Sequence, residues 1–253
     1  MILAFSKSPA RRLATVGLVA LVFSGCSIPT VKPTPSPSPL DTVAPSTPPY
    51  TLGPTMAAGA CPTTTPAALT GTATVTMTTN FGTIVINVDG SLGPNAAGAF
   101  VALARCGYYN NVLFHRIIPG FVIQAGDGTY ARLPNPTVDC GVLGTGGPNW
   151  NVTDDPVKTT YKRGTVAMAR GASANSGSSQ FFIVMDDKAA TDLAGTGFNN
   201  YAIFGNVTAG MDVADKIVAV PTGGDPCKDS SGSLSPLNMP LAPIVITNVT
   251  VTP

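Results

Sequence analysis

The alternation of apolar and polar residues predicts a chain built from many short strands. Residues 72–78 alternate, Asn80-Phe81-Gly82 has the composition of a turn, and residues 83–88 resume the alternation, which predicts a β-hairpin. Short apolar runs bounded by glycine or polar residues predict further strands at 113–117, 121–124, 165–169, 180–185, 201–204 and 244–251. No internal repeat accompanies this pattern.

Two segments have helical periodicity instead. Residues 94–105 carry apolar positions at a spacing of three to four, begin with a proline and are followed by Gly107. Residues 209–218 form the second such segment. Many short strands with two scattered helices predict a mainly β protein, a closed β-barrel with helical plugs.

One apolar stretch, Phe114–Gln124, contains an arginine that needs a physical explanation. Alternation along a strand predicts that Phe114 and Arg116 point to one face and His115 to the other. Val122 and Gln124 share a face beyond the Pro119-Gly120 turn. A charged side chain among apolar neighbours costs free energy unless it has a partner or a task, so Arg116 is a candidate functional residue.

The first 25 residues have the pattern of a signal peptide. A positively charged start is followed by the apolar run Leu13–Phe23, which is too short to span a bilayer. The run ends in Ser24-Gly25-Cys26, which resembles the bacterial lipobox, in which the cysteine is lipidated after cleavage. We expect an extracytoplasmic protein anchored to the cell membrane through Cys26; secretion without an anchor is the alternative.

Residues 26–70 are dominated by Pro, Thr, Ser and Ala, a composition that cannot form its own core. We interpret this segment as a semi-rigid tether that follows the lipidation site. The folded domain is then expected at 71–253.

Charge and cysteine spacing argue against a nucleic-acid-binding domain and against a zinc site. The net charge of +1 lacks the basic character of a nucleic-acid-binding domain. Outside the cytoplasm the cysteines beyond Cys26 can form disulfides, and they lack the paired spacing of a zinc site. Two bridges are expected, with three connectivities open, among Cys61, Cys106, Cys140 and Cys227.

Three motifs in a fixed order resemble the cyclophilin family of peptidyl-prolyl cis/trans isomerases. They are Phe114–Gln124, Ser179–Ile183 and Ala202–Val207, and the resemblance extends from about Thr74 to Val249. It implies an eight-stranded antiparallel barrel capped by two helices, with the substrate groove on its outer surface. It also implies that no metal, nucleotide or other cofactor is needed.

The resemblance assigns a role to each matching position. Arg116 matches the catalytic arginine, and Gln124 matches the residue that positions it. The proline pocket and the adjoining groove are matched by Phe121, Val122, Ala169, Arg170, Gln180, Phe182, Leu193 and Tyr201. Arg170 stands where the common family pattern has Asn, which predicts a preference for acidic residues near the proline.

A family-like barrel also implies a pairing of the cysteines. Cys61, before the first strand, approaches Cys106 at the end of the first helix. Cys140, in an insertion at 130–143, then reaches Cys227 before the last strand.

The sequence therefore predicts a monomeric prolyl isomerase that acts on proline-containing polypeptides outside the cytoplasm. A membrane-tethered, non-catalytic proline-peptide-binding module is the alternative. A serine hydrolase built on His115 and the serine-rich loop 173–179 is disfavoured, because the chain has no Gly-x-Ser-x-Gly elbow.

Overall fold

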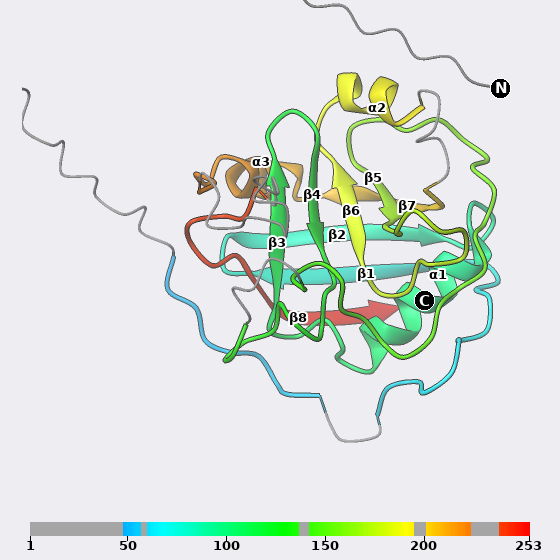
Figure 1. The fold of residues 1–253 in the computed structure, drawn as a ribbon, viewed down its shortest axis with the longest axis horizontal. Helices are drawn as coiled ribbons and strands as arrows, with labels where there is room; N and C mark the ends of the chain where they lie inside the picture. The colour runs from blue at the N-terminus through cyan, green and yellow to red at the C-terminus, as the bar shows by residue number, and fades with distance from the viewer. Residues whose placement is uncertain (1–47, 57–59, 137–141, 195–200, 224–237) are drawn as a thin grey trace, which may run out of the picture. The chain divides into compact units, whose positions relative to one another are not determined.

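A computed structural model describes residues 48–56, 60–136, 142–194, 201–223 and 238–253. Within them eight strands close into a barrel in the order β1-β2-β7-β5-β6-β4-β3-β8 (Figure 1). All eight neighbouring pairs are antiparallel. The predicted eight-stranded antiparallel barrel is confirmed.

The elements lie close to their predicted positions. The strands are β1 (Thr72–Thr79), β2 (Gly82–Asp89), β3 (Val112–Ile118), β4 (Val122–Ala125), β5 (Thr165–Met168), β6 (Phe181–Val184), β7 (Ile203–Ala209) and β8 (Val245–Thr252). The helices are α1 (Pro94–Arg105), α2 (Asp187–Ala194) and α3 (Met211–Val218).

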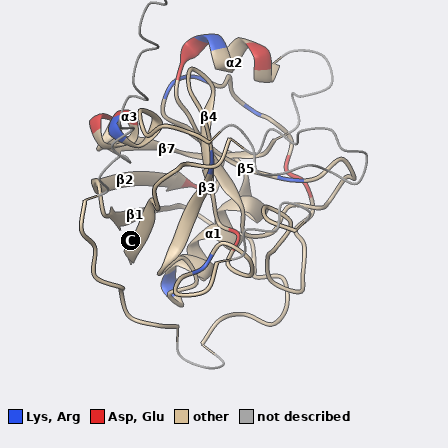
Figure 2. Cartoon of the chain, turned by 60° about the vertical axis from the view of Figure 1, so that its left-hand side comes forward, with Lys and Arg blue, Asp and Glu red and all other residues tan. Residues whose placement is uncertain are grey.

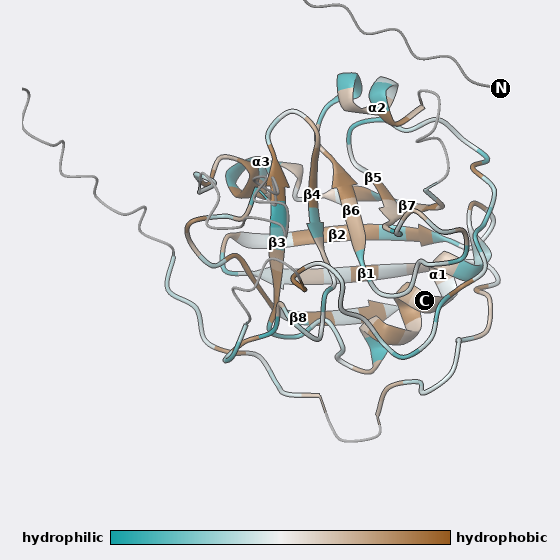
Figure 3. Cartoon of the chain, viewed as in Figure 1, coloured by the Kyte–Doolittle hydropathy of each residue, from teal (hydrophilic) through white to brown (hydrophobic). Residues whose placement is uncertain are grey.

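Both predicted helices are present as α1 and α3, and the structure adds a third, α2, that was not predicted. Its buried face consists only of Ala189, Ala190 and Leu193, and the remaining positions are mostly charged or polar (Figures 2 and 3). A stripe one turn long is too short to show as a helical period. The second predicted helix also begins later than expected, because β7 continues to Ala209 and Gly210 adopts a φ of 88° before α3.

Aromatic side chains from several elements fill the barrel. Phe100 of α1 lies with its ring centroid 5.1 Å from that of Phe181 on β6 and 4.8 Å from that of Phe204 on β7. All three are fully buried, and each such side chain contributes roughly 1.5–3 kcal/mol by leaving water. The helix α1 is thereby fixed against β6 and β7.

A β-bulge interrupts β3 at the centre of the motif. Phe114 pairs with Ala125 of β4, whereas Arg116 pairs with Gln124, so one residue of β3 is left over. The expectation that Phe114 and Arg116 share a face was therefore wrong. Phe114 is fully buried in the core, Arg116 is half-buried beside a pocket, and His115 is buried against Gly144.

The described part of the predicted tether is attached to the barrel. The backbone N–H of Gly53 donates to Asn111 Oδ1 at 2.8 Å, and that of Leu69 donates to the carbonyl of Pro94 at 2.9 Å. A disulfide joins Cys61 to Cys106, as predicted. The expected domain start at residue 71 thus falls after residues that already contact the domain, because a segment without its own core uses the barrel surface instead.

The remaining N-terminal and cysteine predictions lie outside the described residues. They concern the signal peptide at 1–25, Cys26, and the pair Cys140 and Cys227. Among the residues that are described, no helix combines the length and apolar character needed to cross a membrane.

Removing the disulfide should lower the stability of the domain. The bond closes a loop with a sequence separation of 45 residues, and replacing Cys61 and Cys106 together with Ser restores the freedom of that loop in the unfolded chain. We expect the free energy of unfolding, measured by urea denaturation, to fall by about 2–4 kcal/mol. An unchanged urea midpoint would show that the bond does not constrain the unfolded chain.

His115 should make stability depend on pH. Burial lowers its pKa to about 4, while Asp127 raises the pKa and Arg116 lowers it. The histidine of the unfolded chain has a pKa of about 6.5, so between pH 6.5 and 4 it is protonated in the unfolded chain and neutral in the folded one. The contribution of His115 to the free energy of unfolding is therefore fully present above pH 6.5. It is lost as the pH falls toward 4, by up to roughly 1.4 kcal/mol per pH unit.

The test compares urea denaturation of the wild type and His115→Gln between pH 7.5 and 5. His115 is the only histidine of the chain, so the variant should lose most of this slope. An equal slope in both proteins would assign the pH dependence to other groups.

Candidate active site

The candidate site begins with a line of side-chain hydrogen bonds from β3 across β4 to Gln180, the residue before β6. Arg116 Nη1 donates to Gln124 Oε1 at 3.1 Å, and Gln124 Nε2 donates to Gln180 Oε1 at 3.0 Å. Gln180 Nε2 donates in turn to the carbonyls of Gly144 and Gly146, at 2.8 and 2.9 Å. Each amide is therefore oriented by the next, and the orientation of Arg116 depends on the loop at 142–147.

A buried carboxylate holds that loop. Asp127 is fully buried, and its Oδ2 accepts the backbone N–H groups of Gly144 at 2.7 Å and Gly146 at 3.2 Å. Its Oδ1 accepts those of Thr129 and Tyr130. Four donors compensate the buried charge. Asp127 was not predicted as a site residue; its signal in the sequence is an acidic residue between two glycines that is followed by the Gly144-Thr145-Gly146-Gly147 cluster.

A small pocket of about 180 Å³ opens beside Arg116. The structure brings nine of the ten predicted catalytic and substrate-binding residues together in its lining: Arg116, Phe121, Val122, Gln124, Ala169, Arg170, Phe182, Leu193 and Tyr201. Leu193 reaches the pocket from α2, the helix that was not predicted. Phe182 and Tyr201 meet edge to face at 5.3 Å and form an apolar wall.

Arg116 supplies positive charge to this pocket. Burial lowers the pKa of its guanidinium below the ordinary value, with Tyr201 acting in the opposite direction. Within the described residues it forms no ion pair with a carboxylate. Its orienting partner is the neutral amide of Gln124, so the guanidinium keeps its charge while its position is held.

A large pocket of about 580 Å³ adjoins the small one, and the two share Gln124, Ala169 and Arg170 in their linings. The tenth predicted residue, Gln180, lines the large pocket, whereas His115 lines neither. The other lining residues are mostly polar or glycine: Thr129, Tyr130, Gly144, Thr145, Gly146, Gly147, Pro148, Asn149, Asn151, Gly171, Ser176 and Ser178. The two pockets together form a groove that can hold an apolar ring and an extended segment next to it.

The guanidinium of Arg170 has partners within the protein, which reduce its effect on a bound substrate. Its Nε lies 3.8 Å from Asp154 Oδ2, and its Nη1 donates to the carbonyl of Ser173 at 2.9 Å. We therefore expect a weaker preference for acidic substrate residues than an isolated arginine would give. No group of three or more potential metal-ligating side chains occurs in the part of the chain that the structure describes.

Comparison with known proteins agrees with this geometry. The sequence model of the family described as "Cyclophilin type peptidyl-prolyl cis-trans isomerase/CLD" matches residues 74–251. "Peptidyl-prolyl cis-trans isomerase A" of Dickeya dadantii is 37% identical over 172 residues, which cover 68% of this chain and 80% of the relative. "Peptidyl-prolyl cis-trans isomerase B" of Escherichia coli is 37% identical over 151 residues, 59% of this chain and 86% of the relative.

A solved structure is similar as well. The cyclophilin-type isomerase of Cryptosporidium parvum, crystallised in the presence of the dipeptide Ala-Pro, is 26% identical with a TM-score of 0.53. The similarity covers 71% of this chain and 99% of that one. The barrel, the matched motifs and the relatives together show that this chain belongs to the cyclophilin-type peptidyl-prolyl cis-trans isomerases, a family of enzymes.

Proposed function

We propose that this protein accelerates rotation about Xaa-Pro bonds in exported proteins, with Arg116 stabilising the twisted prolyl amide. The observation that carries the proposal is a charged guanidinium, oriented by Gln124, at the edge of an apolar pocket of about 180 Å³. The pocket suits a pyrrolidine ring, and Phe121, Val122 and Phe182 would hold that ring in place.

The physical problem is the barrier to rotation. The C–N bond has partial double-bond character, with a rotation barrier of roughly 18–20 kcal/mol. X-Pro bonds consequently interconvert over about tens to hundreds of seconds. When the bond is twisted, conjugation is lost and the prolyl nitrogen becomes a better hydrogen-bond acceptor.

A donor fixed near that nitrogen binds the twisted state more tightly than either planar isomer, and this difference in binding lowers the barrier. Arg116 can act in this way because Gln124 holds it without neutralising it. No general base, nucleophile or cofactor is required by this mechanism.

The residues that flank the proline would lie in the large pocket. The shared lining residues Gln124, Ala169 and Arg170 make the two pockets neighbours, so an extended peptide with its proline in the small pocket continues into the large one. Gln180, a largely buried residue in the lining of the large pocket, can contact the peptide backbone there.

Replacement of Arg116 tests the mechanism. Arg116→Ala removes the donor and should reduce kcat/KM about 10²- to 10³-fold in a protease-free isomerisation assay. Arg116→Lys keeps the charge but loses the planar guanidinium, and should recover only part of the rate. Lys216→Ala on α3, an exposed lysine that lines neither pocket, is the matched control and should match the wild type.

The same assay distinguishes an isomerase from the alternative, a non-catalytic proline-peptide-binding module. A non-catalytic binding module would bind proline peptides without accelerating isomerisation, and Arg116→Ala would then leave the observed rate at the wild-type value. Such a result would exclude the arginine mechanism.

We further propose that the protein acts outside the cytoplasm, anchored to the membrane by lipid on Cys26. The support is the charged start, the apolar run Leu13–Phe23 and the Ser24-Gly25-Cys26 sequence. Intact-mass analysis of the protein from the membrane fraction of a bacterial host should show loss of residues 1–25 and added lipid. Cys26→Ala should abolish the lipid mass, and an unmodified, cleaved chain in the medium would instead indicate plain secretion.

A further inference from the structure

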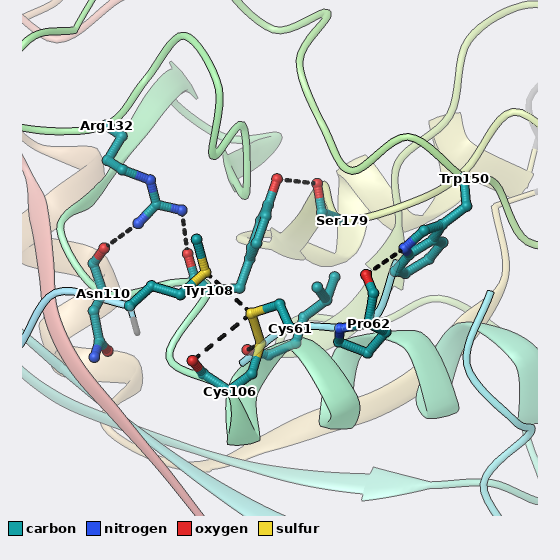
Figure 4. The surroundings of a disulfide bond; sticks show 10 residues. Cys61, Pro62, Cys106, Tyr108, Asn110, Arg132, Trp150 and Ser179 are labelled. Carbon is teal, nitrogen blue, oxygen red and sulfur yellow. Dashed lines mark hydrogen bonds between the residues drawn. A yellow bond between two sulfur atoms is a disulfide. The ribbon is translucent and has the colours of Figure 1, made fainter. Parts of the chain in front are cut away.

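One wall of the large pocket is supported from behind by the N-terminal segment. Asn149 and Asn151 line this wall, and between them Trp150 is buried. Trp150 Nε1 donates to the carbonyl of Pro62 at 3.0 Å (Figure 4). Thr65 Oγ1 donates to the carbonyl of Asn151 at 2.8 Å. We call residues 60–70 the strap. The strap thus holds the wall at two positions from outside the groove.

The wall needs such support because it has no regular structure. Residues 148–151 belong to no helix or strand, so no ladder of backbone hydrogen bonds fixes their position. On its other side the segment continues into Val152, whose N–H donates to the carbonyl of Gly177 at 2.9 Å. The wall therefore lies between the strap and the loop that contains Ser176 and Ser178, which also line the pocket.

A second set of contacts reaches the pocket from the end of α1. Tyr108 and Tyr109 follow Cys106 closely in the chain. The hydroxyl of Tyr108 shares a 3.3 Å hydrogen bond with Ser179 Oγ (Figure 4). The hydroxyl of Tyr109 donates to the Ser179 carbonyl at 2.9 Å. Ser179 lies between two lining residues, Ser178 and Gln180. This turn therefore supports a second part of the pocket lining, around Ser178 and Gln180.

The disulfide joins these two supports. Cys61 belongs to the strap and directly precedes Pro62, whereas Cys106 caps α1 and leads into the two tyrosines. We propose that the Cys61–Cys106 bond is a positioning element of the substrate groove, which keeps the strap against the 148–151 wall. It thereby determines how tightly the residues flanking the proline are bound. The inference rests on the proposed function, because it assigns the large pocket to those residues.

This role differs from stabilisation of the fold alone. A bond that only stabilised the folded chain would affect all substrates of the folded enzyme equally, or none of them. A bond that positions the wall affects substrates that extend into the large pocket and spares those confined to the small one. Arg116 and its partners are not part of the strap contacts, so the rate of the bound complex should not change.

The experiment uses the full chain and two substrates, a blocked Ala-Pro dipeptide and a peptide with several residues on each side of the proline. In the Cys61→Ser/Cys106→Ser variant we expect KM for the long peptide to rise roughly fivefold, as for the loss of about one hydrogen bond. The kcat of this variant for the long peptide and its kcat/KM for the dipeptide should both remain at wild-type values. Cys140→Ser with Cys227→Ser is the matched cysteine control and should leave KM unchanged.

A second variant keeps the disulfide and removes one strap contact. Trp150→Phe preserves the aromatic bulk but deletes the N–H that Pro62 accepts, so it should raise KM for the long peptide in the same way. Thr65→Val deletes the hydroxyl that donates to the carbonyl of Asn151, and it should also raise KM for the long peptide. These variants decide the question if the double serine variant does not fold.

Binding provides a readout that does not require turnover. Trp150 is the only tryptophan of the chain, so its fluorescence reports on the wall when the long peptide is titrated. Unchanged affinity and KM for the long peptide in folded Thr65→Val and double serine variants would overturn the proposal, as would an equal loss for both substrates. If the wild type turns over neither substrate, the proposed function fails, and the long-peptide affinity of wild type and variants still decides the role of the strap.

Discussion

The hydrogen bond between Arg116 and Gln124 is the interaction on which the site depends. A half-buried guanidinium usually pairs with a carboxylate, which would cancel its field in the pocket. An amide orients it and leaves its charge intact. The buried carboxylate of Asp127 accepts backbone N–H groups of the 142–147 loop. That loop fixes Gln180, and Gln180 fixes Gln124, so the anion contributes to order without neutralising the cation.

Much of the barrel and of the small pocket could be predicted because their signals are local and dense. Alternation in the first hairpin directly predicts which side faces the core, and the burial of Val75, Met77, Ile84 and Ile86 agrees with it. The long motif from Phe114 to Gln124 carries enough specific positions to indicate a family. Residues of that motif and of its partner segments then line one pocket.

The features that could not be predicted depend on tertiary contacts. The helix α2 presents one short apolar face, which becomes a helix signal only when the barrel is there to cover it. Asp127 is an ordinary loop residue until the 142–147 loop folds back on it. The strap has the composition of a disordered tether, and composition reports only that a segment lacks its own core. Whether it uses the surface of another element is decided by single contacts such as Trp150 with Pro62.

The bulge in β3 makes one position of the strand independent of the pairing with β4. Phe114 opposite Ala125 and Arg116 opposite Gln124 are consecutive pairs on β4, although His115 stands between them on β3. Deletion of His115 would leave the same pairs in a regular ladder, with Phe114 still in the core and Arg116 still beside the pocket, and would remove only the side chain that lies against Gly144. Deletion of a residue from the regular part of the strand would instead exchange the residues that face the core and the groove beyond that point. The strand therefore tolerates a change of length at the bulge and not elsewhere.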